Sequence, residues 1–72
     1  MAKKIRELKQ MLWKAGFQEI SGKGSHTNWI HPLYPGKLTV SGQDSADAKL
    51  YQEKEVLSAI QAVEENQHDE HS

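Results

Sequence analysis

His26 follows a glycine-rich turn and opens a short segment of mixed polar and apolar residues. An imidazole takes up or releases a proton near neutral pH, so it can serve as a general acid or base. Glycines in a turn let backbone N–H groups approach a phosphate closely. Residues 22–26 therefore place a proton-transfer group beside a candidate phosphate-binding turn. A turn-stabilising or merely solvent-facing His26 is the alternative.

The chain has 72 residues, which is enough for one small domain with a single core. A closed small-molecule pocket needs walls around about 300 Å³ or more, and few residues are left to build them. We therefore expect a substrate gripped on the surface, such as a polymer or another protein. The chain has no cysteine, which excludes disulfides and thiolate metal sites and suits a reducing compartment. It also has no apolar run long enough for a membrane span or a signal peptide, so we expect a soluble, cytoplasmic protein without membrane contact.

The net charge of −1 conceals a division along the chain. Residues 1–42 carry seven bases and two acids, whereas residues 43–72 carry two bases and eight acids. The half that contains His26 is therefore cationic and can attract phosphates. Ordinary solvated lysines are the alternative interpretation.

Apolar spacing predicts a helix at each end of the chain and three strands between them. The first helix carries Ile5, Leu8, Leu12 and Ala15 on one face, and Gly16 is placed to end it in a left-handed cap. The predicted strands are residues 17–21, 26–31 and 37–41, with Pro32 and Pro35-Gly36 in a turn that belongs to neither neighbouring strand. The second helix carries Val56, Ala59, Ile60 and Val63, and starts after a cap at Ser45 or Asp47, or only near Tyr51.

Side chains alternate along a strand, so the second strand has two different faces. One face carries Thr27, Trp29 and His31, and the other carries His26, Asn28 and Ile30. Trp29 is the bulkiest apolar group, so we expect its face to pack on the core and His26 to lie on the open face. The result is an α+β fold, in which two helices cover one face of a three-stranded antiparallel sheet. We expect one domain over residues 1–63 and a polar, frayed tail over residues 64–72. Trp13 lies about a quarter-turn off the apolar stripe, so we expect it at the margin of the core, with stacking on a base as the alternative. The tail histidines are expected to be solvated rather than to bind a metal.

Three segments, in this order, carry a resemblance to a known family. They are Ala15-Gly16-Phe17, then Lys23-Gly24-Ser25-His26 running to His31-Pro32, then Val40-Ser41-Gly42 with residues 47–56. Over residues 4–63 the chain resembles the HicA family of bacterial toxins. These are small mRNA interferases whose fold is related to double-stranded-RNA-binding domains.

The resemblance implies a type II toxin that cleaves mRNA, needs no cofactor or metal, and is inhibited by a HicB-type antitoxin. It also maps the family's catalytic histidine onto His26. RNA supplies its own nucleophile, the ribose 2′-hydroxyl, and a neutral imidazole can take that proton as the oxygen attacks the adjacent phosphorus. Donors near the phosphate must stabilise the growing charge, and the candidates are Lys23, Gly24, Ser25 and Asn28.

His31 and Lys49 are secondary candidates. We expect His31 to be a hydrogen-bonded structural residue, with a proton donor to the departing 5′ oxygen as the alternative. Lys49 is one of two bases at the second helix, which is otherwise acidic. That acidity, and Ser41-Gly42-Gln43 where many members have a proline and another histidine, favour the alternative function: a noncatalytic RNA-binding or protein-interaction module of the same fold.

Overall fold

The computed structural model describes residues 3–20, 22 and 24–71, with side chains as far as residue 66. It contains α1 (Ile5–Lys14), β1 (Gln18–Ile20), β2 (His26–His31), β3 (Tyr34–Ser41) and α2 (Leu50–His71). The strands form one antiparallel sheet in the order β1-β2-β3. The predicted fold class and element order are therefore confirmed.

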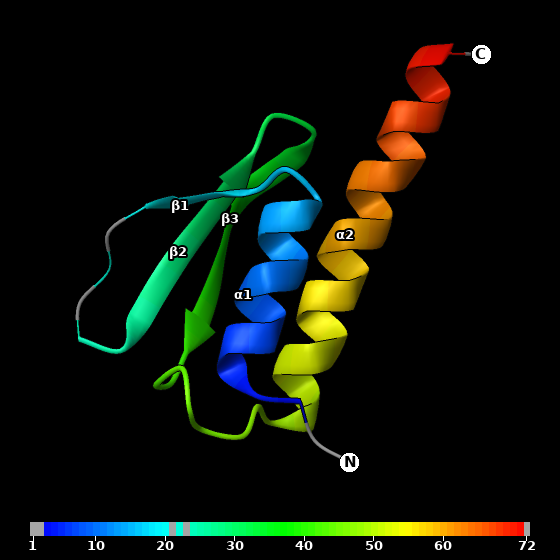
Figure 1. Ribbon diagram of the computed structural model, residues 1–72. Coiled ribbons are helices and arrows are strands. Elements are labelled where there is room, and N and C mark those ends of the chain that lie inside the picture. Colours follow the sequence, from blue (N-terminus) through cyan, green and yellow to red (C-terminus); the bar gives the residue numbers. More distant parts are fainter. Residues whose placement is uncertain (1–2, 21, 23, 72) are drawn as a thin grey trace.

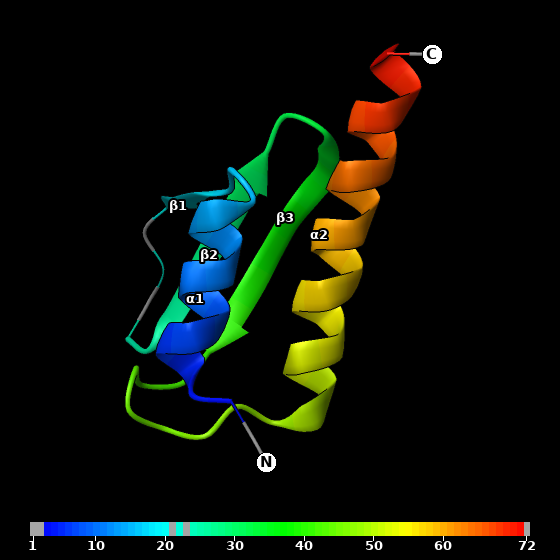
Figure 2. The same ribbon diagram turned by 45° about the vertical axis from the view of Figure 1, so that its right-hand side comes forward.

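Both helices pack against the same face of the sheet. α1 lies between β3 and α2 in one view (Figure 1), and in the turned view it lies in front of β2 while α2 runs alongside β3 (Figure 2). The two helices and the sheet share one core, whose largest member is Trp29 with 0% of its surface exposed. The other core residues are Ile5, Leu8, Leu12, Phe17, Leu38, Val40, Ala48, Val56, Ala59 and Val63. The opposite face of the sheet carries neither helix.

α1 has the apolar stripe and the terminating glycine that the sequence predicts. Its apolar stripe is buried at Ile5, Leu8 and Leu12, as the spacing predicts. Gly16 follows the helix with a φ of +94°, a left-handed conformation that favours glycine. A Cβ at Gly16 would lie 3.1 Å from Nε2 of His31, so the same position also allows a close approach between α1 and β2.

The third strand starts earlier than predicted, and the assignment of Pro35-Gly36 to a turn was wrong. β3 begins at Tyr34, and only Pro32 and Leu33 form the turn after β2. The register pairs Trp29 with Leu38 but His31 with Tyr34, so two steps along β2 correspond to four along β3. The extra residues form an irregularity on an edge strand, where a missing proline N–H breaks no ladder bond. Gly36 adopts a φ of +74° within it.

α2 begins at Leu50, close to the latest of the predicted starts. Asp47 does not cap it: its carboxylate forms an ion pair with Lys4 at 2.7 Å, and its backbone bridges to that residue. Val63 is the last buried residue before the exposed residues 64–66, and the helix continues to His71. Within the described residues, no helix is both long and apolar enough to cross a membrane.

Candidate functional site

His26 lies at the first position of β2, on the face of the sheet that carries no helix. The predicted faces of this strand are confirmed, because Trp29 is buried in the core and His26 is exposed. Across the strands His26 pairs with Ser41, the last residue of β3. Nδ1 of the imidazole lies 2.7 Å from Oγ of Ser41, which fixes the orientation of the ring. The ring is therefore held on one side and open to solvent on the other.

A second polar pair lies next to the first on the same face. Oγ1 of Thr39 donates a hydrogen bond of 2.8 Å to Oδ1 of Asn28, and these two residues are also register partners. Asn28 is only partly exposed and Thr39 is exposed. Ile20 and Ile30 lie on this face beside Asn28 and are 37% and 36% exposed. The open face thus combines a polar strip with exposed apolar side chains.

The turn before β2 brings backbone donors close to His26. Gly24 has a φ of +58° and open space around it. The carbonyl of Ser25 accepts a hydrogen bond from the N–H of Gly42, which closes this end of the hairpin. In the described part of the chain, the N–H groups of Gly24 and Ser25 make no hydrogen bond. Lys23, the nearest cation in sequence, lies outside the described residues.

Glycine is required at position 22 because there is no space for a side chain, and not because of its backbone dihedral angles. A Cβ at this position would collide with the backbone carbonyl of His26. Glycine therefore lets the chain before the turn pass against the start of β2, which places the imidazole at the mouth of the hairpin.

One residue of the site has no signal in the sequence. Gln52 of α2 is 5% exposed and is the buried polar side chain among the described residues. Its Oε1 accepts a hydrogen bond of 2.9 Å from the N–H of Ser41, and its Nε2 donates one of 3.1 Å to the carbonyl of Ser41. In a helical pattern this glutamine resembles any solvated side chain, so only the tertiary structure reveals its partner.

A family comparison covers most of the chain. The model of the family described as HicA toxin of bacterial toxin–antitoxin systems matches residues 5–62, which is most of the chain. The chain belongs to the HicA toxin family. Neither the search of curated proteins nor the search of solved structures returned a match. As a HicA family member it is a toxin of a bacterial toxin–antitoxin system, and an antitoxin is its implied partner.

In this HicA toxin His31 does not lie beside His26. The two histidines are the two ends of β2 and lie on opposite faces of the sheet. Nδ1 of His31 accepts a hydrogen bond of 2.9 Å from the N–H of Leu33, and its ring packs on Phe17 at a centroid distance of 5.0 Å. His31 therefore fixes the turn after β2, as expected for a structural residue.

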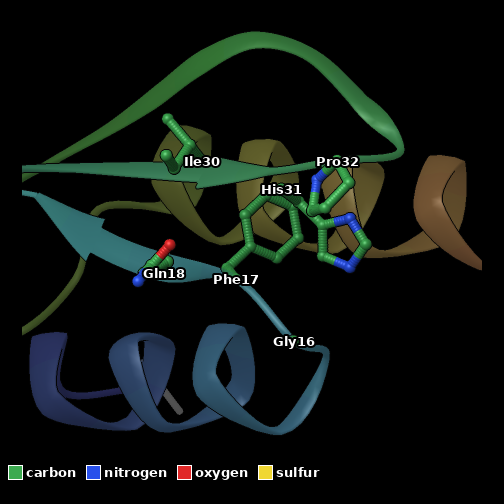
Figure 3. Close-up of a pocket in the computed structure, with 6 residues that line it drawn as sticks. All are labelled: Gly16, Phe17, Gln18, Ile30, His31 and Pro32. Carbon is green, nitrogen blue, oxygen red and sulfur yellow. The ribbon is translucent and has the colours of Figure 1, made fainter.

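A pocket of about 520 Å³ opens beside His31, away from His26. Its lining residues come from the connection between α1 and β1, the start of β1, and the end of β2 with the turn that follows (Figure 3). They are Gly16, Phe17, Gln18, Ile30, His31 and Pro32. The pocket therefore belongs to the far end of β2 and not to the candidate site.

Three further lysines differ in whether an acidic side chain neutralises them. Lys49 is exposed and directly precedes α2. Gln52, in the first turn of that helix, hydrogen-bonds Ser41. Lys9 of α1 forms an ion pair of 2.6 Å with Asp44, and Lys4 pairs with Asp47. Two bases of the cationic half are thus paired with acids of the other half, on the side of the molecule that carries the helices.

Proposed function

We propose that this HicA toxin is a metal-independent endoribonuclease that cleaves mRNA, with His26 as its general base, and that a HicB-type antitoxin neutralises it. The observation that carries the proposal is the imidazole of His26, exposed on the open face with Nδ1 held by Ser41. Nε2 then faces solvent, where a nucleotide can reach it. A structural histidine would pack against other side chains, as the partly buried His31 does against Phe17.

The reaction is an internal transesterification of RNA. Nε2 of His26 takes the proton of a ribose 2′-hydroxyl while that oxygen attacks the adjacent phosphorus. A bond forms between the 2′ oxygen and phosphorus, and the bond from phosphorus to the 5′ oxygen breaks. The departing oxygen takes a proton from water, and the imidazolium returns its proton to solvent. The products carry a 2′,3′-cyclic phosphate and a 5′-hydroxyl.

Backbone donors of the turn would stabilise the phosphate. The N–H groups of Gly24 and Ser25 make no hydrogen bond in the described part of the chain, and negative charge grows on the phosphoryl oxygens during the attack. Lys23 would add a positive charge to the same turn. Asn28 lies two residues along β2 on the same face, in a position to contact the next nucleotide.

A partner that covers the open face would block the reaction. Ile20 and Ile30 expose apolar surface on this face, and apolar burial is the main favourable contribution to protein association. An antitoxin seated on these residues would also shield His26 from RNA. Co-expression of the antitoxin is therefore expected to relieve growth arrest by the toxin.

Incubation of the purified toxin with end-labelled mRNA in a chelator tests the proposed activity. We expect fragments to accumulate, because neither the nucleophile nor the base is a metal ligand. A gel shift that weakens with salt and leaves the RNA intact would contradict the proposal. It would instead indicate the noncatalytic RNA-binding module.

A further inference from the structure

Gln52 hydrogen-bonds the backbone at the end of β3, in the way that a neighbouring strand would. β3 is an edge strand, and its last residue, Ser41, has an N–H and a carbonyl that β2 does not pair. The side-chain amide of Gln52 binds both groups, at 2.9 and 3.1 Å. A polar side chain that is 5% exposed is costly to bury unless its hydrogen bonds are made, and here donor and acceptor are both satisfied.

This contact fixes the backbone from which the Ser41 hydroxyl projects. Ser41 has its two backbone groups on Gln52 and its Oγ at 2.7 Å from Nδ1 of His26. The three residues come from α2, β3 and β2, so a chain of hydrogen bonds joins the buried side of α2 to the open face of the sheet. A shift of Ser41 by about 1 Å away from β2 would take its hydroxyl out of hydrogen-bond distance of the imidazole.

The direction of the hydrogen bond at Nδ1 determines which nitrogen is available for chemistry, because the Ser41 hydroxyl can accept from an N–H at Nδ1 or donate to a lone pair there. A neutral imidazole has one N–H and one lone pair, and the hydrogen bond of one nitrogen sets the state of the other. If the N–H of Nδ1 donates to Oγ of Ser41, the lone pair is on Nε2, which is the nitrogen that faces solvent. A general base needs that tautomer.

We propose that Ser41 and Gln52 are positioning residues: Gln52 holds Ser41, and Ser41 holds His26 in the tautomer with the proton on Nδ1. This inference rests on the proposed function only for its effect on RNA cleavage. The tautomer itself is a property of the free toxin, and its measurement needs no RNA.

Nitrogen NMR of histidine-labelled toxin tests the proposal, since the shifts of Nδ1 and Nε2 report the tautomer directly. In the wild type we expect the neutral His26 to carry its proton on Nδ1. Ser41→Ala removes the hydroxyl but keeps both backbone contacts of Gln52, and it should shift the ring toward the other tautomer. Ser41→Thr restores a hydroxyl and should restore the wild-type spectrum.

Gln52→Met tests the second link, because methionine has a similar shape but makes neither hydrogen bond. We expect the His26 spectrum to change as it does in Ser41→Ala. Asn66→Ala is the matched control: Asn66 is also an amide of α2 bonded to a backbone carbonyl, that of Leu33, at the opposite end of the sheet. It should leave the spectrum unchanged. If Gln52→Met does not fold, Gln52→Glu, which keeps the acceptor but not the donor, is measured in its place.

Cleavage kinetics give the functional arm of the test. Ser41→Ala is expected to lower kcat about tenfold and leave KM within about twofold, the size of effect that one hydrogen bond has on a transition state. A folded Ser41→Ala or Gln52 variant with the wild-type His26 spectrum would overturn the positioning proposal. A wild type with the expected spectrum but no RNA cleavage would overturn the proposed function and leave the positioning intact.

Discussion

Substitution of His26 by alanine is expected to reduce the rate of RNA cleavage by about 10²–10⁴-fold, the usual contribution of a general base. The fold should be retained, because the imidazole is exposed and its hydrogen bond to Ser41 lies at the surface. We expect the free energy of unfolding to change by less than about 1 kcal/mol. Single-turnover cleavage of a labelled RNA and urea unfolding followed by circular dichroism measure the two quantities.

His31→Gln is the matched control for this substitution, because it removes the other imidazole of β2. It gives up the packing on Phe17 and should lower stability, but the folded variant should still cleave RNA, since His31 lies at the far end and on the opposite face. Cleavage by His26→Ala at the wild-type rate would refute the assignment of the base. Loss of cleavage in folded His31→Gln would show that the reaction needs both rings.

Trp29→Ala is expected to unfold the toxin. The side chain is 0% exposed, and its indole N–H donates a hydrogen bond of 3.0 Å to Oγ1 of Thr27. Trp29 belongs to the core cluster that also contains the buried residues of α1 and α2. Truncation of a buried tryptophan costs about 3–5 kcal/mol. A core of this size rarely supplies more than about 3–5 kcal/mol of net stability, so the variant should be largely unfolded at 25 °C.

Trp13→Ala provides the comparison within the same pair of rings. Trp13 packs edge-on against Trp29 at a centroid distance of 5.2 Å but is 52% exposed. Its loss should cost about 0.5–1.5 kcal/mol, the range for an aromatic pair. Circular dichroism and urea unfolding of the two variants separate them, and equal losses of stability would contradict the assignment of Trp29 to the centre of the core.

Local patterns predicted much of this structure because the information they use is local. Alternation along β2 assigned Trp29 to the core and His26 to the open face without knowledge of any other element. The apolar stripe of α1 and the left-handed Gly16 are set by residues within a few positions of each other. The position of Trp13 at the margin of the core, packed on Trp29, also follows from its helical position.

What sequence patterns did not predict depends on contacts between distant segments. The pairing of His26 with Ser41 follows from strand register, which an irregularity at Pro35-Gly36 shifts. Gln52 resembles a surface residue until α2 is placed against the end of β3. The ion pairs between the basic and acidic halves were not predicted for the same reason. Lys4 and Lys9 meet their acidic partners only when the loop before α2 folds back on α1.

The central claim is that RNA itself supplies the nucleophile and His26 removes its proton. Analysis of the ends of RNA fragments produced by the wild-type toxin in a chelator tests this claim most directly. We predict 2′,3′-cyclic phosphates at the new 3′ ends and hydroxyl groups at the new 5′ ends, and no cut at a linkage whose ribose is replaced by 2′-deoxyribose. Fragments with 3′-hydroxyl and 5′-phosphate ends, or a cut after the deoxyribose, would show that water attacks the phosphorus and would contradict the account.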